Sequence, residues 1–147
     1  MDVISGLGGN DTVDSGAGND VVCGDAGDDR LAGGNGNDRI AGEAGHDVLG
    51  GNAGADRLSG FAGNDILRGQ AGDDVLDGGD SHDFARNWGN DVLVGGAGRE
   101  VLRGSAGNDT FYTRDGEADI VRGYAGKDTC WAERLDVITG CETVHIG

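Results

Sequence analysis

The feature that most constrains the fold is a nine-residue period, because aspartate recurs at every ninth position from Asp2 to Asp83. An apolar residue follows each of these aspartates by two positions, and glycine precedes most of them by two. The unit is G-x-x-G-x-D-x-(aliphatic)-x, as in the segment GGNGNDRIA at 33–41. Such a period indicates a repeat architecture in which each unit contacts its neighbours in the stack.

The period becomes irregular in the second half of the chain. Asp83 and Asp91 are eight residues apart, Glu100 and Asp109 resume the spacing of nine, and Asp109 and Asp119 are ten apart. The shortening and the lengthening cancel, so we expect the stack to continue with two local distortions.

Each unit combines a glycine-rich turn of six residues with a strand of three residues that has one inward aliphatic side chain. One unit cannot bury that side chain, but two units wound as an 18-residue coil can face their aliphatics across a thin core. Coils stacked ~4.8 Å apart then pair into two parallel sheets. The sequence therefore predicts an all-β fold, a parallel β-roll (a right-handed β-solenoid) with two repeats per coil over residues 1–131. A short C-terminal cap, closed by a disulfide, follows at 132–147 in the same domain.

Aspartates 18 residues apart lie above one another in such a coil, which predicts two ladders of carboxylates. Stacked carboxylates ~5 Å apart repel by about 3 kcal/mol per pair at an effective dielectric constant near 20, so the fold needs cations between them. Carboxylate and carbonyl oxygens favour calcium, whereas zinc and copper would require recurring His or Cys, and magnesium retains its waters. The first ladder is Asp2, Asp20, Asp38, Asp56, Asp74, Asp91, Asp109 and Asp128; the second is Asp11, Asp29, Asp47, Asp65, Asp83, Glu100 and Asp119.

The composition points to cations as the partners of this chain. There are 27 acidic and 11 basic residues, a net charge of −16 and only 5% aromatic residues, so the chain cannot bury enough apolar surface to fold alone. The absence of a basic patch argues against nucleic acid as a partner. The absence of an apolar stretch of roughly 20 residues argues against a membrane span.

The repeat resembles the hemolysin-type (RTX) calcium-binding nonapeptide family, whose motif is GGxGxDxUx, over residues 2–131. The resemblance implies that each calcium site lies between two successive loops on one edge of the roll. The lower loop would contribute its aspartate and the carbonyls two and four residues before it. The upper loop would contribute its aspartate and the carbonyls three and five residues before it.

Seven pairs of loops have full length, so the resemblance implies about seven calcium ions, which would cancel most of the charge of −16. The aspartates of these pairs are Asp11, Asp20, Asp29, Asp38, Asp47, Asp56, Asp65, Asp74 and Asp83, with Asp109 as a further ligand. The lower-loop carbonyls are those of Leu7, Gly9, Gly16, Gly18, Asp25, Gly27, Gly34, Gly36, Glu43, Gly45, Asn52, Gly54, Phe61 and Gly63. The upper-loop carbonyls are those of Gly24, Ala26, Gly33, Asn35, Gly42, Ala44, Gly51, Ala53, Gly60, Ala62, Gly69, Ala71, Gly78 and Asp80. We expect sites that include Asp91, Glu100 or Asp119 to be weak, altered or empty, because their loops depart from the motif.

Two cysteines, Cys130 and Cys141, flank a tail that lacks the repeat. We expect a disulfide that closes a short loop over the open end of the roll, worth ~2–4 kcal/mol. The alternative is a zinc site that includes His145, for which no fourth ligand is evident. The side chains expected to cover the last coil are Trp131, Val137, Ile138 and Val144.

The remaining cysteine and two histidines have simpler expectations. Cys23 occupies an outward position and is expected to be a free thiol. His46 and His82 fill variable loop positions and are expected to be solvated. A second metal site of His82 with Asp80 and Asp83 is the alternative.

Together these features predict a calcium-binding structural module without catalysis, a secreted and extracellular monomer that folds when calcium binds. The ending D-x-I-x-G-C-E-x-V resembles small exported bacterial calcium-binding proteins, and a disulfide implies an oxidising compartment. The alternative is a calcium-dependent accessory or export domain of a larger secreted enzyme or adhesin. Ice binding would need a flat ladder of threonines, which the outward positions do not form. No protein partner is indicated.

Overall fold

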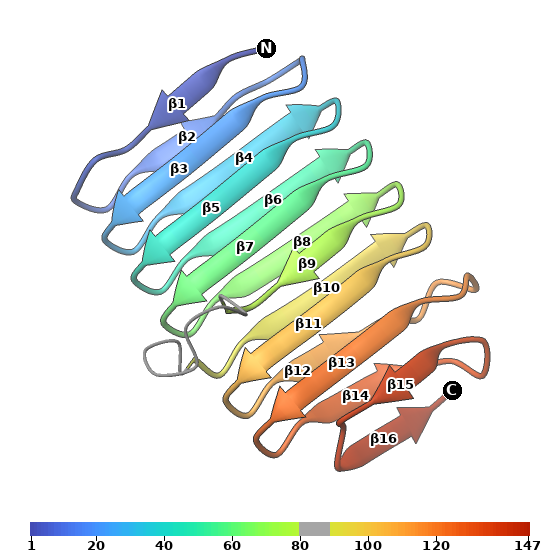
Figure 1. Ribbon diagram of the computed structural model, residues 1–147. Helices are drawn as coiled ribbons and strands as arrows, with labels where there is room; N and C mark the ends of the chain where they lie inside the picture. The colour runs from blue at the N-terminus through green and yellow to red at the C-terminus, as the bar shows by residue number, and fades with distance from the viewer. Residues whose placement is uncertain (80–88) are drawn as a thin grey trace.

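The computed structural model describes residues 1–79 and 89–147, and within them the chain winds into two eight-stranded parallel sheets (Figure 1). The odd-numbered sheet contains β1 (Val3–Ser5), β3 (Val21–Ala26), β5 (Arg39–Ala44), β7 (Arg57–Ala62), β9 (Val75–Asp77), β11 (Val101–Ala106), β13 (Ile120–Ala125) and β15 (Val137–Thr139). The even-numbered sheet contains β2 (Thr12–Asp14), β4 (Arg30–Asn35), β6 (Val48–Ala53), β8 (Ile66–Ala71), β10 (Val92–Ala97), β12 (Thr110–Tyr112), β14 (Thr129–Ala132) and β16 (Thr143–Ile146). No helix that could cross a membrane occurs in the described residues.

The core is a single file of inward side chains from each sheet. Leu49, Leu58, Leu67 and Leu76, each two residues after an aspartate, are at most 1% exposed, and the residues beside them in the strands face outward. Strands of the same sheet pair in register at a separation of 18 residues, as Leu49 pairs with Leu67. The expected parallel β-roll with two repeats per coil is therefore confirmed.

The register changes where residues 80–88 intervene. Leu67 of β8 pairs with Leu93 of β10, so successive coils are here 26 residues apart instead of 18. The N–H of Asp65 donates to Oδ1 of Asp91 at 2.8 Å, and the expected pairing of Asp65 with Asp83 is therefore wrong. The two ladders consequently exchange members beyond this point, because β9 pairs with β11, which places Glu100 and not Asp91 after Asp74. Asp80, His82 and Asp83 themselves lie outside the described residues.

The glycines on either side of residues 80–88 occupy the first and the second glycine position of one loop. A Cβ on Gly78 would lie 2.3 Å from Oδ2 of Asp91, as the first glycine of a regular loop does with its own aspartate. A Cβ on Gly89 would lie 1.6 Å from the carbonyl oxygen of Gly63, which is the contact of the second glycine of a loop with the coil before it. Residues 78–79 joined to 88–91 read GGWGND, a full loop motif. Residues 80–87 are therefore eight extra residues within one repeat.

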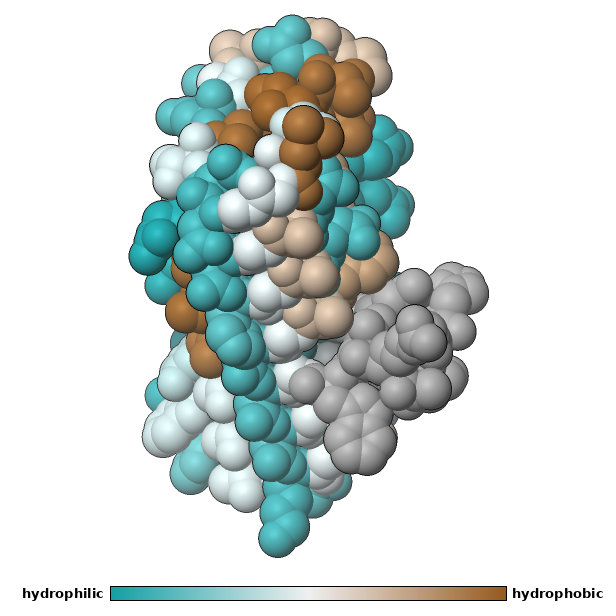
Figure 2. All heavy atoms as spheres, turned by 90° about the vertical axis from the view of Figure 1, so that its left-hand side faces the viewer, coloured by the Kyte–Doolittle hydropathy of each residue, from teal (hydrophilic) through white to brown (hydrophobic). Residues whose placement is uncertain are grey.

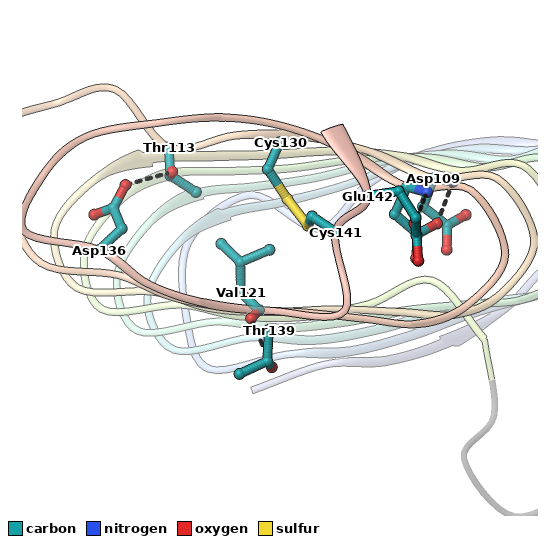
Figure 3. Close-up of a disulfide and its surroundings, with 9 residues drawn as sticks. Asp109, Thr113, Val121, Cys130, Asp136, Thr139, Cys141 and Glu142 are labelled. Atoms are coloured by element: carbon teal, nitrogen blue, oxygen red, sulfur yellow. Dashed lines mark hydrogen bonds between the residues drawn. A yellow bond between two sulfur atoms is a disulfide. The ribbon is translucent and has the colours of Figure 1, made fainter. Parts of the chain in front are cut away.

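The C-terminal tail extends both sheets by one more coil, because β15 pairs with β13 and β16 pairs with β14. The expected disulfide between Cys130 and Cys141 is confirmed and lies at this end of the roll (Figure 3). The zinc alternative is wrong, since both thiols are used in the bond. Ile138 packs against the core as expected. Trp131 does not cover the last coil; its ring stacks on the outer face, with centroids 6.4 Å from Tyr112 and 4.0 Å from His145.

Deletion of residues 80–87 should leave the roll folded, because it restores an uninterrupted motif and shortens a loop whose closure costs entropy. We expect the circular dichroism spectrum in calcium to be retained and the urea midpoint to be unchanged or higher. The matched control is deletion of residues 44–51, also eight residues, which breaks the register inside two regular strands. Loss of the β spectrum in the first variant would contradict the assignment of an insertion.

Candidate metal centre

Each of the loops before Asp11 to Asp74 turns through a residue in the left-handed region, four positions before its aspartate. Glycine fills this position at Gly34 (φ 97°), but Glu43 (φ 79°), Asn52 (φ 78°) and Phe61 (φ 71°) adopt it elsewhere. The second glycine of a loop is required by a close approach: a Cβ on Gly36 would lie 1.7 Å from the carbonyl oxygen of the loop one coil earlier. Successive loops therefore pack in direct backbone contact and hold their aspartates in register.

One oxygen of each carboxylate ties two coils together. Oδ1 of Asp38 accepts the N–H of Asp20 at 2.7 Å, and Oδ1 of Asp47 accepts the N–H of Asp29 at 2.8 Å. The same bond recurs along both ladders. Its acceptors are Asp20, Asp29, Asp38, Asp47, Asp56, Asp65, Asp74, Asp91, Asp109, Asp119 and Asp128.

The other carboxylate oxygen is buried and has no hydrogen-bond partner among the described residues. A buried charge is costly unless a cation or a donor compensates it. The residues that carry such an Oδ2 are Asp11, Asp20, Asp29, Asp38, Asp47, Asp56, Asp65, Asp74, Asp109, Asp119 and Asp128. These rows of buried, unpaired oxygens are the feature of the structure that most requires a cation.

A carbonyl from the next coil faces the same space as this oxygen. A Cβ on Gly24 would lie 2.2 Å from Oδ2 of Asp29 and 2.9 Å from the carbonyl oxygen of Gly42. The first glycine of a loop is thus needed because the carboxylate occupies the place of its side chain. The carboxylate of the lower loop and the carbonyl five residues before the next aspartate are therefore brought together, and both are hard oxygen donors suited to calcium.

Some of the expected carbonyl ligands already accept a backbone hydrogen bond from a neighbouring coil. The N–H of Gly27 donates to the carbonyl of Ala44 at 2.8 Å, and the N–H of Gly36 donates to that of Ala53 at 2.7 Å. A carbonyl oxygen has a second lone pair, so these bonds leave one acceptor position on each. No three His, Cys, Asp or Glu side chains converge on one point anywhere in residues 1–79 and 89–147. The ladders thus offer carboxylates in pairs, with carbonyls as the other donors.

Burial makes these carboxyl groups weak acids in the folded chain. It raises the pKa of Asp91 to about 8 and that of Asp109 to about 7, with neighbouring carboxylates adding to the effect. The pKa of Glu100 is likewise raised to about 8, first by burial and then by the Asp119 carboxylate. Burial also raises the pKa of Asp65 and of Asp74 to about 6. The ladders therefore favour a bound proton where no metal compensates the charge.

The distorted positions differ from one another. Asp91 keeps the regular bonds, because it accepts from Asp65 and its N–H donates to Oδ1 of Asp109 at 2.9 Å. Glu100 keeps only one of them: its N–H donates to Oδ1 of Asp119 at 2.9 Å, but its own Oε1 and Oε2 have no partner in the described part of the chain. Its longer side chain still reaches the loop interior, where a Cβ on Gly95 would lie 2.7 Å from Oε2. Weak or empty sites at Glu100 and Asp119 remain a prediction, whereas the short loop expected before Asp91 is wrong, because Gly78 and Gly89 hold its two glycine positions.

The sequence analysis did not predict the last acceptor in either of the two carboxylate ladders. Oδ1 of Asp136 accepts the N–H of Asp119 at 3.1 Å. Its Oδ2 accepts from Thr113 at 2.8 Å (Figure 3) and from the N–H of Glu133 at 2.7 Å. Glu142 accepts the N–H of Asp128 at 2.7 Å. The available signal was the aspartate directly before Val137, the place that aspartate holds before every regular strand.

A further row of hydrogen bonds runs along the outside of the loops, and the sequence analysis did not predict it. Where the side chain directly before an aspartate is an acceptor, it accepts a backbone N–H from the next coil: Asn10 accepts from Asp28, Asp28 from His46, and His46 Nδ1 from Asn64, at 2.9–3.0 Å. These residues are exposed, and the edge that carries them shows a continuous hydrophilic stripe (Figure 2). The expectation that His46 is exposed is confirmed, although its Nδ1 is engaged. Cys23 is free and half-buried, as expected.

Comparison with known families gives one match. The sequence matches the family described as RTX calcium-binding nonapeptide repeat (4 copies) over residues 2–22, 24–58, 59–85, 87–117 and 115–134, which is most of the chain. No curated protein matches it.

Adding a methyl group to the first glycine of one loop should weaken one metal site. A Cβ at Gly51 would lie 2.3 Å from Oδ2 of Asp56 and 2.9 Å from the carbonyl of Gly69, so Gly51→Ala should displace the carboxylate and raise the calcium midpoint. Gly50→Ala is the control on the same strand, because its Cβ would meet only Nε2 of Gln70, at 3.4 Å. Calcium titrations of both variants by calorimetry test this. Equal midpoints would show that the space beside Asp56 is not used by a metal.

The raised pKa values predict that acid favours the calcium-free fold. A carboxyl whose pKa rises from ~4 in the unfolded chain to about 8 in the roll, as at Asp91, stabilises the folded state fully below ~4 and loses this contribution as pH rises through about 8. Calcium-depleted protein should therefore show more β structure by circular dichroism at about pH 5 than at about pH 8. A spectrum that does not change between these values would contradict the prediction.

Proposed function

Because the chain belongs to the RTX calcium-binding nonapeptide-repeat family, we propose that calcium ions bind between its successive loops and that the chain folds into the roll when they bind. The module is structural, a calcium-dependent rod without catalysis.

The row of buried carboxylate oxygens without a hydrogen-bond partner carries this proposal. These oxygens recur along each ladder, and several, such as those of Asp29, Asp56 and Asp65, face a carbonyl oxygen of the coil that follows. Repulsion of about 3 kcal/mol per stacked pair, at an effective dielectric constant near 20, exceeds what one buried leucine per repeat supplies. A divalent cation converts that repulsion into attraction and supplies the missing partner.

Regular sites are proposed at the pairs in which both loops have full length. The pair Asp65/Asp91 takes the place expected for Asp65/Asp83. The pair Asp119/Asp136 is excluded from the proposal, because protein donors already satisfy both oxygens of Asp136. The six unchanged pairs are Asp11/Asp29, Asp20/Asp38, Asp29/Asp47, Asp38/Asp56, Asp47/Asp65 and Asp56/Asp74.

The setting that suits such a module is outside the cell. Extracellular calcium modules bind at ~10⁻⁴–10⁻³ M, so the chain would stay unfolded at cytosolic calcium and fold after export. The Cys130–Cys141 disulfide fits an oxidising compartment. Each interior loop takes part in two sites, so one bound ion orders half of the next site and binding should be cooperative.

A calcium titration followed by circular dichroism tests the proposal, with the chelated protein expected to be largely disordered. Asp38→Ala should lower the calcium stoichiometry and raise the midpoint, because Asp38 belongs to two pairs. Asp28→Ala is the matched control: this carboxylate is exposed and accepts only the N–H of His46, at 2.9 Å. Full β structure in the chelated wild type, or equal effects of the two substitutions, would overturn the proposal.

A further inference from the structure

Two arginines lie side by side on the outer face of the odd-numbered sheet. Arg39 of β5 and Arg57 of β7 are in-register partners on adjacent parallel strands, and both are exposed. Adjacent strands are ~4.8 Å apart, and like charges placed directly opposite in this way destabilise a sheet. In-register partners before and after them in the same row are Val21 and Val75, so no acidic neighbour in the row offsets the charge.

Neither guanidinium has a partner in residues 1–79 or 89–147. In a chain with 27 acidic residues, no ion pair or hydrogen bond joins Arg39 or Arg57 to any side chain of the described residues. Asp38 precedes Arg39 directly, but its carboxylate points into the coil and is 1% exposed. Glu43 is outward on the same strand but lies four residues further along, about 13 Å at the rise of a strand. The positive charge of Arg39 and Arg57 is therefore not neutralised by any side chain of the described residues.

Open space adjoins the pair on both sides. One hollow lies toward the loops and is lined by Met1, Asn19, Asn37, Asp38 and Ala55 together with both arginines. The other lies over the strands and is lined by both arginines together with Val21, Val22, Cys23, Ile40, Ala41, Ser59 and Phe61. The small side chains of Ala41 and Ser59 leave room beside the guanidinium groups, and the Ser59 hydroxyl has no hydrogen-bond partner among the described residues.

We propose that Arg39 and Arg57 form a binding site for a tetrahedral oxyanion, the phosphate or sulfate ester group of a larger ligand. Planar guanidinium groups bind such oxygens through paired, charge-assisted hydrogen bonds, and two of them at the spacing of adjacent strands can share one anion. A bound anion removes the like-charge repulsion that the empty pair suffers. The acidic ladders are no obstacle, because their carboxylates lie on the opposite side of the backbone and salt screens exposed charges beyond ~8 Å.

The same sheet face shows what distinguishes this pair. Arg103 of β11 and Arg122 of β13 are also in register, but Asp77 precedes Arg103 in its row, so an acidic neighbour is present there. On the even-numbered sheet, Arg30 and Arg68 are exposed but lie on β4 and β8, with β6 between them. They carry equal charge without being in-register partners and therefore provide a matched control.

The test uses the full chain in calcium and two soluble probes, glucose 6-sulfate and glycerol 3-phosphate. The backbone N–H signals of Ala41 and Ser59, which line the hollow beside the pair, are followed by NMR for the wild type, Arg39→Gln/Arg57→Gln and Arg30→Gln/Arg68→Gln. We expect saturable binding that the first double variant weakens by about tenfold or more, as loss of charge-assisted hydrogen bonds implies, while the control keeps it. Circular dichroism in calcium verifies that each variant is folded.

A third variant, Arg39→Lys/Arg57→Lys, keeps the charge and the fold but lacks the planar fork, so it should bind more weakly than the wild type. Preference for the sulfate probe indicates a sulfated sugar as the source of the group, and preference for the phosphate probe indicates a lipid-type headgroup. The proposal is overturned if neither probe saturates, if both glutamine variants lose binding equally, or if the lysine variant binds as the wild type does.

Discussion

Electrostatic repulsion within two stacks of buried carboxylates is the constraint on which the rest of this structure depends. A coil of 18 residues buries two aliphatic side chains and also two aspartates, so charge is buried as often as apolar surface. One oxygen of each aspartate is satisfied by the backbone of the neighbouring coil, which fixes the position of the charge without neutralising it. The glycine positions beside the carboxylates follow from that arrangement, and so does the proposal that an external cation compensates the charge.

The two glycines that recur in the loops are needed for different reasons. At Gly36 the limit is the carbonyl of the loop below, which would lie 1.7 Å from an added Cβ, so this glycine sets how closely coils can stack. At Gly51 the limit is the carboxylate of its own loop, so this glycine sets how far the aspartate can turn inward. Stacking distance and ligand placement are thus controlled separately, and the positions between them can vary as freely as Glu43, Asn52 and Phe61 do.

The sequence predicted the architecture and the core because the nine-residue period determines both which side chains point inward and which residues stack. It failed at residues 80–88 for a specific reason: Asp83 falls at the nine-residue spacing by coincidence within an eight-residue insertion. Ser81 in place of glycine and Ala85 in place of an aliphatic were the local signals that this unit is not a repeat. The rung at Asp136 was missed because its loop has no glycine motif, and the unpaired arginines because outward positions carry no periodic signal.

The two ends of the ladder show that hydrogen bonds and a cation can play the same role. In the interior, Oδ2 of each aspartate has no donor available, because the loop that surrounds it presents carbonyl oxygens. At Asp136 the chain departs from the motif, and Thr113 and the N–H of Glu133 donate to the corresponding oxygen. Together with the disulfide at Cys130, these donors fix the final coil by covalent and hydrogen bonds alone. The repeat motif is therefore the part of the sequence that lacks internal donors, which is the physical reason for proposing that cations bind there.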